Sequence, residues 1–144
     1  MTTETVWHSA TQLVTGDPTL TFSYPIATRP AVEITTTDIG QTNLKWIYLG
    51  IVLPAGCAVT AIRICYQLSD SGSFISQIQL QEMQTPEHTL VAHDDTSELR
   101  ELTPACYVSA VHGYRPKGAV TLAMRLRFHD TVIASRSGAS ELTC

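Results

Sequence analysis

Amide and guanidinium side chains recur at alternate positions in segments whose pattern predicts β-strands. Gln77 and Gln79 are two residues apart, and Arg125 and Arg127 repeat that spacing later in the chain. Alternate residues of a strand point to the same face of a sheet. Amides and guanidinium groups suit the hydroxyls of a sugar, carboxylates or a partner's backbone. If the strand faces join, we predict a surface that binds a glycan or a protein partner through Arg63, Gln77, Gln79, Arg125 and Arg127. The alternative is an ordinary solvated sheet face.

The segment Leu44–Leu53 is apolar on both sides of its predicted strand. Ile47 and Leu49 share one side, and the large side chains of Trp46 and Tyr48 share the other. Large amphipathic side chains of this kind anchor interfaces. We therefore predict that Trp46 and Tyr48 lie between the subunits of a homo-oligomer, with a trimer favoured, or line a cavity for an apolar ligand. The alternative is cover by the N-terminal strand that contains Trp7.

The histidines and acids do not predict a metal site or a catalytic centre. His93 and Asp95 share one face of an extended segment whereas His88 lies on the other, so a third ligand would have to come from elsewhere, such as His112 or His129. Cys65 or Cys106 beside one of those histidines would form a nucleophile–base pair, but five histidines and four cysteines always permit such a combination. Neither a Gly-x-Ser-x-Gly motif nor a glycine-rich phosphate loop occurs. We expect no metal and no cofactor.

The four cysteines have no metal-site spacing, and no pair forms C-x-x-C. The first residues show no basic segment followed by an apolar one, so we expect no signal peptide. The chain is then expected to stay inside the cell or to leave it by a non-standard route. Free thiols are expected in that setting, with a Cys106–Cys144 bridge as the alternative.

Period-two alternation of apolar and polar residues dominates the chain, and no segment keeps a helical period. One or two helical turns are expected at Thr96–Leu102, and a loose tail at residues 137–140. The fold class that follows is an all-β, antiparallel, jelly-roll-like sandwich in one domain, residues 1–144, with a closed barrel as the alternative. The predicted strands are Thr5–His8, Thr19–Tyr24, Ala31–Thr37, Leu44–Leu53, Cys57–Leu68, Phe74–Met83 (as the hairpin partner of Cys57–Leu68), Thr89–His93, Cys106–Val111, Ala119–His129 and Val132–Ser135.

Composition excludes two classes of partner. The chain has 144 residues and a formal net charge of −4, whereas nucleic-acid binding needs clustered basic residues. The longest apolar run, Trp46–Leu53, is far shorter than the roughly 20 residues that a membrane-spanning helix needs. We therefore expect neither nucleic acid nor a membrane as a partner.

One stretch resembles a recurrent pattern of poorly characterised bacterial and phage-associated β-sandwich domains. It consists of an apolar strand with a Pro-x-Gly turn (residues 52–56), the strand start Val59–Ile62, Tyr66, an Asp turn at Asp70, and the next strand with Ile78 and Leu80. The strand at residues 126–128 is similar as well. The resemblance covers roughly residues 45–130 and implies an architecture, but no functional residues.

These observations predict a non-catalytic binding or assembly module, for example an oligomeric head domain of a bacterial or phage surface structure. The alternative is a small enzyme or carrier with an apolar substrate pocket inside the β-structure. Its candidate lining residues are Tyr24, Trp46, Tyr66 and His129.

Overall fold

The computed structural model describes residues 4–24, 31–38, 45–129 and 135–143. These residues form ten strands and one short 3-10 helix, η1 (Ala10–Gln12), and none of their helices is long and apolar enough to cross a bilayer. The strands are β1 (Thr5–Ser9), β2 (Leu20–Ser23), β3 (Val32–Thr36), β4 (Lys45–Ile51), β5 (Val59–Gln67), β6 (Phe74–Thr85), β7 (His88–Asp95), β8 (Ala105–Tyr114), β9 (Ala119–Arg127) and β10 (Ser135–Thr143).

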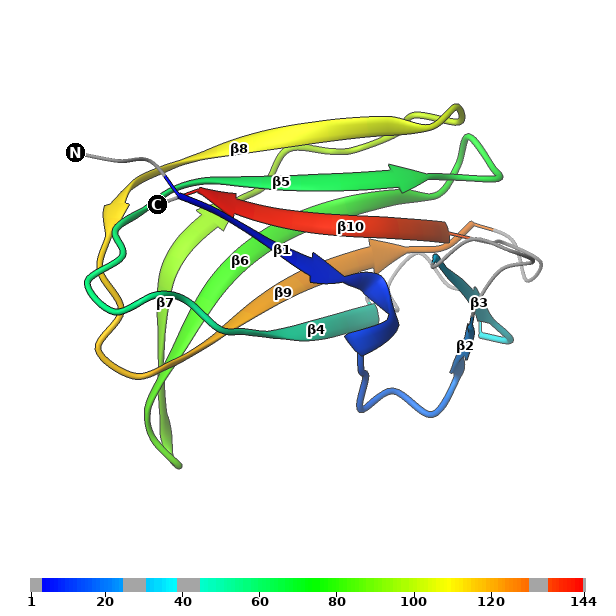
Figure 1. Cartoon of the computed structure of the whole chain (residues 1–144). Coiled ribbons are helices and arrows are strands. Elements are labelled where there is room, and N and C mark those ends of the chain that lie inside the picture. The colour runs from blue at the N-terminus through cyan, green and yellow to red at the C-terminus, as the bar shows by residue number, and fades with distance from the viewer. Residues whose placement is uncertain (1–3, 25–30, 39–44, 130–134, 144) are drawn as a thin grey trace.

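The strands form two antiparallel sheets. Sheet A has the order β2-β3-β10-β5-β8, and sheet B has the order β4-β9-β6-β7. In sheet A, β1 and β3 pair with the same edge of β10, each along a different part of its length. Figure 1 shows β8, β5 and β10 above the strands of sheet B. Because every pairing between described strands falls within one sheet or the other, the all-β, jelly-roll-like sandwich is confirmed, and the alternative of a closed barrel is wrong.

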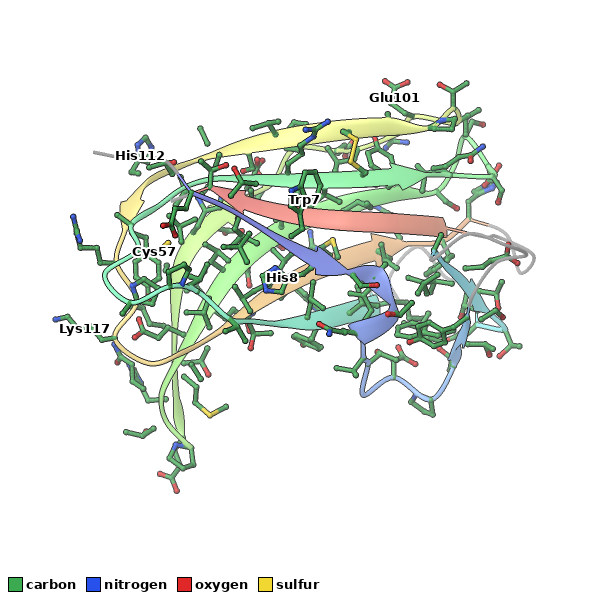
Figure 2. All side chains as sticks on the ribbon, in the orientation of Figure 1. Trp7, His8, Cys57, Glu101, His112 and Lys117 are labelled. Carbon is green, nitrogen blue, oxygen red and sulfur yellow. A yellow bond between two sulfur atoms is a disulfide. The ribbon has the colours of Figure 1, made fainter. Side chains whose placement is uncertain are left out.

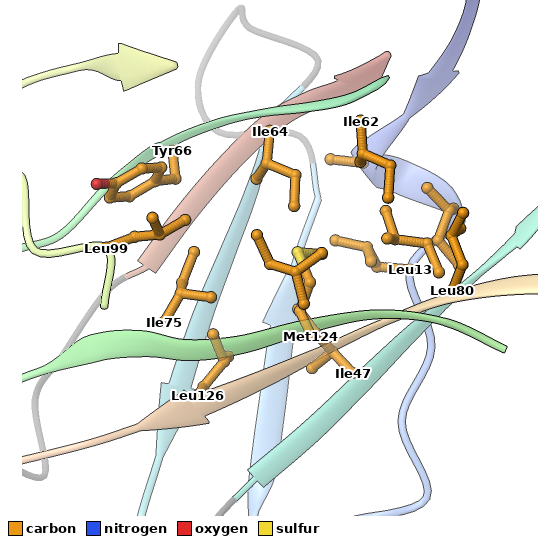
Figure 3. Close-up of a cluster of buried hydrophobic side chains, with 14 of the residues drawn as sticks. Leu13, Ile47, Ile62, Ile64, Tyr66, Ile75, Leu80, Leu99, Met124 and Leu126 are labelled. Atoms are coloured by element: carbon orange, nitrogen blue, oxygen red, sulfur yellow. The ribbon is translucent and has the colours of Figure 1, made fainter. Parts of the chain in front are cut away.

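The core lies between the inner faces of the two sheets. Sheet A contributes Ile62 and Ile64 of β5, which are fully buried, and sheet B contributes Leu80 and Met124. Figure 3 shows these side chains meeting in one cluster. Each fully buried side chain of this size stabilises the fold by about 1.5–3 kcal/mol. This layer buries the apolar faces of β4, β5, β6 and β9 and leaves their opposite faces for other roles.

Sheet B is curved. In Figure 1, β6 and β7 bend along their length, and the turn between them lies far from sheet A. The register of β6 shifts against β9 between Ile75 and Gln77 and against β7 between Leu80 and Gln81, and such bulges bend a strand. In Figure 1 the inside of this bend faces away from sheet A, so the outer face of sheet B is the concave one.

The predicted hairpin of the two strands that flank residues 68–73 is wrong. β5 pairs with β8 and β10 in sheet A, whereas β6 pairs with β7 and β9 in sheet B. Two consecutive strands with one apolar face each can bury these faces side by side in one sheet or face to face across a sandwich. This chain adopts the second arrangement, so the polar faces of β5 and β6 point in opposite directions.

Two other predicted elements are corrected. Residues 96–102 are extended rather than helical, because Leu99 exchanges two backbone hydrogen bonds with Ile75, of 2.9 and 3.1 Å, and buries its side chain in the core. The expected loose tail is part of β10, which pairs with β5 on one side and with β1 and β3 on the other. A strand held on both edges by backbone hydrogen bonds can form from a polar sequence. Positions 132–134 of the predicted last strand lie outside the described residues.

Candidate functional site

The outer face of sheet B carries a regular array of polar and aromatic side chains. Strand register places residues from different strands directly opposite one another, so the array is organised in rows across the sheet. The first row is Trp46, Arg125 and Gln77, and the second is Tyr48, Ala123, Gln79 and Asp94. Ala123 is fully buried although it lies on this outer face, so larger neighbouring side chains close over it.

Two aromatic rings form one border of the array. Trp46 and Tyr48 stack with 6.4 Å between ring centroids and an interplanar angle of 17°, and both side chains are half-buried. The Arg125 guanidinium carbon lies 5.8 Å from the centroid of the Trp46 ring, and Nε of Arg125 donates to Ser76 Oγ at 2.8 Å. These contacts fix the guanidinium, and neither of its two terminal nitrogens is hydrogen-bonded to another described residue.

Amides and one carboxylate form the opposite border. Gln77 Nε2 donates to Asp94 Oδ1 at 2.5 Å, and Gln79 Nε2 donates to the same oxygen at 3.3 Å. Gln81 Nε2 donates in turn to Gln79 Oε1 at 2.8 Å. Because each amide is held by its neighbour, the row presents hydrogen-bonding groups in a fixed orientation.

The segment before β2 completes the edge of sheet B beside the aromatic pair. Val14 and Tyr48 exchange backbone hydrogen bonds of 2.8 and 2.9 Å, and Thr15 Oγ1 donates to the carbonyl of Trp46 at 2.7 Å. Directly opposite residues of an antiparallel pair point to the same face, so Val14 extends the second row. Its side chain is exposed there.

A buried ion cluster holds the beginning of β4. Lys45 Nζ lies 3.0 Å from Asp38 Oδ2 and 3.2 Å from Asp17 Oδ2, and it donates to Thr19 Oγ1 at 2.7 Å. Burial alone would lower the pKa of Lys45, but hydrogen bonds and charge attraction from the two carboxylates outweigh burial and raise it. The cluster fixes the strand residue next to Trp46.

The predicted binding residues are brought together except for one. Gln77, Gln79, Arg125 and Arg127 all lie on neighbouring strands of the outer face of sheet B. Arg63 lies on the outer face of sheet A, where its guanidinium carbon is 5.9 Å from the centroid of the exposed Trp7 ring (Figure 2). The surface predicted to include all five residues therefore does not form, because β5 and β6 belong to different sheets.

Trp46 and Tyr48 join this array instead of lining a cavity between the sheets. The alternative that the strand with Trp7 covers them is wrong, because β1 belongs to sheet A and Trp7 is 57% exposed. The other residues of the predicted apolar pocket do not converge on Trp46. Tyr66 is buried between the sheets, Tyr24 donates to the carbonyl of Leu13 at 2.8 Å, and the side chain of His129 is 62% exposed.

His93 and Asp95 lie at the junction of β7 with β8 and point inward, on the side of β7 opposite Asp94. His93 Nε2 is 2.8 Å from Ser109 Oγ, which donates to Asp95 Oδ2 at 2.5 Å. A Ser-His-Asp triad needs the histidine between the other two residues, whereas here the serine is between them. Burial alone would raise the pKa of Asp95, but hydrogen bonds from Ser109, Ser97 and Tyr107 hold it well below its usual range. Within the described ranges, no three His, Cys, Asp or Glu side chains form a group that could hold a metal ion.

The expectation of free thiols is wrong for the described cysteines. Cys65 and Cys106, which are directly opposite on β5 and β8, form a disulfide, and Cys57 is disulfide-bonded as well. The alternative bridge between Cys106 and the last residue is wrong for the same reason. The sequence spacing could not show this pair, because its two strands are far apart in the chain.

No protein-family model matches the sequence, and no curated protein matches it. The resemblance noted for residues 45–130 therefore stays a prediction. Solved structures do match the fold. One is a carbohydrate-binding module, CBM36, in complex with calcium and xylotriose, with a TM-score of 0.56 and 11% identity over 95% of this chain and 98% of that chain.

Two further structures are similar over nearly the whole chain. The CBM36-1 domain of a multidomain xylanase from the hindgut metagenome of Trinervitermes trinervoides has a TM-score of 0.56 and 8% identity over 96% of both chains. The CBM22-1–GH10 modules of Clostridium thermocellum endo-1,4-beta-D-xylanase 10B, complexed with xylohexaose, give a TM-score of 0.61 and 8% identity over 93% of this chain and 26% of that chain. At these identities the likeness concerns the β-sandwich fold.

Proposed function

We propose that this chain is a non-catalytic carbohydrate-binding module, which holds a saccharide chain against the concave outer face of sheet B. The likeness of its sandwich to modules solved with xylotriose and xylohexaose supports this proposal. The observation that carries it comes from the side chains of this chain. It is the placement of the stacked Trp46–Tyr48 pair across one strand from a hydrogen-bonded row of glutamines and Asp94.

The two borders of the array match the two kinds of surface that a sugar presents. A pyranose ring has a face of C–H groups, which packs against an aromatic ring, and a rim of hydroxyls, which donate and accept hydrogen bonds. Trp46 and Tyr48 supply the aromatic surface. The side-chain amides, the second oxygen of Asp94 and the terminal nitrogens of Arg125 supply partners for the hydroxyls.

Fixed side chains lower the cost of binding. Ordering a flexible side chain at an interface costs about 0.5–1.5 kcal/mol, and this cost is reduced where the free protein already holds the group in place. Gln77, Gln79 and Arg125 each have a partner in the free chain, at 2.5 to 3.3 Å. The array is therefore ready to bind before the saccharide arrives.

Among the residues that the structure describes, the two rows lack the pair of carboxylates that hydrolysis needs. Most glycoside hydrolases place two carboxyl groups about 5–9.5 Å apart, one on each side of the bond that they cleave. The two rows described above contain one carboxylate, Asp94, and it accepts hydrogen bonds from two amides. Binding without cleavage is the activity that these rows support.

A binding panel tests the proposal. The purified chain is passed over immobilised xylan, mannan, mixed-linkage glucan, polygalacturonate and alginate. Its affinity for any polysaccharide that retains it is then measured by isothermal titration calorimetry. We expect micromolar to millimolar affinity for one glycan class. We also expect its loss in the double variant Trp46→Ala, Tyr48→Ala, and its retention in Trp7→Ala. An unchanged affinity in the double variant would refute the placement of the site, and binding to none of the glycans would favour a protein partner.

The predicted homo-oligomer, with a trimer favoured, stays a prediction alongside this proposal. Because Trp46 and Tyr48 belong to the proposed glycan site, the subunit interface would have to use another surface. Light scattering on a size-exclusion column gives the absolute mass and tests the trimer directly.

A further inference from the structure

A pocket of about 210 Å³ opens at one end of the outer face of sheet B. Its lining residues are Gly72, Phe74, Glu98, Arg100, Arg127, Phe128 and His129. The Phe74 ring is buried beneath two guanidinium groups, whose carbons lie 3.8 Å (Arg100) and 5.6 Å (Arg127) from the ring centroid. Two guanidinium groups thus share one small concavity with a single carboxylate, that of Glu98, in a chain whose formal net charge is −4.

Strand register makes this pocket a continuation of the proposed saccharide site. Phe74 lies opposite Arg127, one step along the sheet from the row of Trp46, Arg125 and Gln77. The pairing of Leu99 with Ile75 places Arg100 beside Phe74 on the other side. Residues two apart on a strand are separated by about 7 Å, comparable with the length of one sugar unit. The pocket also lies one to two strands across the sheet from Trp46, at about 4.8 Å per strand, so a saccharide of two or three units on the aromatic pair would reach it.

The charges in the pocket are only partly compensated. Within the part of the chain that the structure describes, Arg127 has no carboxylate partner. Arg100 donates from Nε to Glu98 Oε2 at 2.9 Å, and its Nη2 lies 2.9 Å from the same oxygen, which leaves further N–H groups of the guanidinium uncommitted. The Nδ1 atom of His129 is 3.3 Å from Asp70 Oδ2. Arg127 is thus the cation most available to an incoming anion.

The backbone next to the pocket is shaped around the histidine. A Cβ atom added at Gly72 would lie 2.4 Å from Cγ of the His129 ring, so only glycine leaves room for the ring in this position. The ring is thereby held at the rim of the pocket by the main chain beneath it. Together with the two guanidinium groups, it forms a rim with several N–H donors.

We propose that this pocket binds the carboxylate of a uronic acid, so that the ligand of the module is an acidic saccharide. The inference rests on the proposed glycan-binding function and names its ligand class. A carboxylate is planar and accepts two parallel hydrogen bonds from a guanidinium group, which is the geometry that Arg127 offers. The neutral sugars next to the uronic acid lie on Trp46, Tyr48 and the amide row.

The test compares matched ligands that differ only in charge. Calorimetry measures the affinity of the whole chain for galacturonic acid oligomers and for glucuronic-acid-substituted xylo-oligosaccharides, each beside its carboxyl-reduced counterpart. We expect at least one acidic oligomer to bind about tenfold tighter than its reduced form, because hydrogen bonds to a charged group are stronger than those between neutral groups. The preference should weaken as salt is raised.

Substitutions assign the preference to the pocket. Arg127→Gln should bring the ratio of the two affinities close to one by weakening the binding of the acidic oligomer, and a urea denaturation midpoint equal to that of the wild type shows that the variant is folded. Arg127→Lys, which keeps the charge but loses the planar fork, should retain part of the ratio. Arg63→Gln on sheet A is the matched control and should keep all of it.

The outcomes separate the two proposals. Equal binding of acidic and reduced oligomers, with loss of both in Trp46→Ala, Tyr48→Ala, would overturn the carboxylate pocket and leave the glycan site intact. A preference for the acid that survives Arg127→Gln would overturn the pocket as its source. Binding of no oligomer of either kind would overturn the carboxylate pocket, and binding to none of the polysaccharides of the panel would overturn the glycan site as well.

Discussion

Each sheet carries a tryptophan with an arginine beside its ring, yet the two pairs have different surroundings. On sheet B, the Arg125 guanidinium carbon is 5.8 Å from the Trp46 ring, and on sheet A the Arg63 guanidinium carbon is 5.9 Å from the Trp7 ring. Trp46 is half-buried and stacked on a second aromatic ring, whereas Trp7 is 57% exposed. The same two residue types thus belong to the proposed site on one face and to a surface contact on the other.

Under the proposed function, the two faces differ in the neighbours that each pair has across several strands rather than in the pair itself. Trp46 has an ordered row of amides across β9, and the bend of sheet B gathers these groups on a concave side. Sheet A instead carries the Cys65–Cys106 disulfide between its neighbouring strands β5 and β8. We infer that sheet A contributes covalent stability and that sheet B contributes recognition. The predictions below test this division.

The largest expected effect is on stability. Replacing both Cys65 and Cys106 with alanine removes a cross-link between residues 41 apart in sequence. Loss of a bridge that closes a loop of this length should lower the free energy of unfolding by about 2–4 kcal/mol. Urea denaturation at 25 °C measures the loss, and calorimetry should find saccharide affinity unchanged below the transition. A variant as stable as the wild type, or one that is fully folded but does not bind, would contradict the division between the sheets.

The next effect separates the two tryptophans. Trp46→Ala should weaken saccharide binding by about 30-fold or more, because truncating a central aromatic anchor of an interface typically costs 2 kcal/mol or more. Trp7→Ala should change the affinity less than about twofold. Calorimetry with the same oligosaccharide measures both variants, and comparable losses would show that the two faces are not distinct.

A smaller effect is expected in the amide row. Asp94→Asn removes the charge of the carboxylate that holds Gln77 and Gln79, and it should weaken binding by about tenfold, since hydrogen bonds to a charged group contribute about 1.5–3 kcal/mol. The matched control on sheet A is Gln67→Ala, whose amide donates to the carbonyl of Leu102 at 3.3 Å. If the control lost as much affinity as Asp94→Asn, the row would have no special role.

The smallest effect is a pH dependence at the contacts between the sheets. Burial lowers the pKa of His93 despite the opposing charges of Asp95 and Asp94, and burial also lowers that of His8, whose Nε2 accepts the Val52 N–H at 3.2 Å (Figure 2). As the pH falls, these rings take up a proton near pH 6.5 in the unfolded chain and only at a lower pH in the folded chain. Stability is therefore complete above about pH 6.5 and falls as the pH drops below it, by less than about 1.4 kcal/mol per pH unit for one proton.

Urea denaturation between pH 7.5 and 5 measures this slope. Replacing His93 with glutamine should flatten it, whereas the same change at the exposed His88 should leave it unchanged. A slope that is the same in His93→Gln and in the wild type would exclude His93 as its source.

Local alternation made part of the site predictable. The spacing of Gln77, Gln79, Arg125 and Arg127 places each pair on one face without knowledge of the fold, because side-chain direction in a strand is a local property. The pairing of faces is not local. Arg63 shows the same alternation as Arg125 and lies on the other sheet, because the loop of residues 68–73 crosses the sandwich instead of closing a hairpin.

Two residues of the pocket, Phe74 and Arg100, could not be predicted from the sequence, each for a different physical reason. Phe74 shares the sequence parity of Ile78 and Leu80 and is expected in the core, but the bulge between Ile75 and Gln77 turns it to the outer face. Arg100 falls in a segment with the features of a short helix, and only the distant pairing of Leu99 with Ile75 holds that segment extended. A bulge and a long-range bridge leave no local signal in the sequence.

The chain has two tryptophans, one on each face, and this gives the most direct test of the saccharide site. A two-dimensional ¹H–¹⁵N NMR spectrum should contain one indole N–H signal for Trp7 and one for Trp46, assigned with the variant Trp7→Phe. On titration with the oligosaccharide that the panel identifies, the account predicts a saturable shift of the Trp46 signal and a stationary Trp7 signal. A saturable shift of the Trp7 signal with Trp46 unmoved would contradict it.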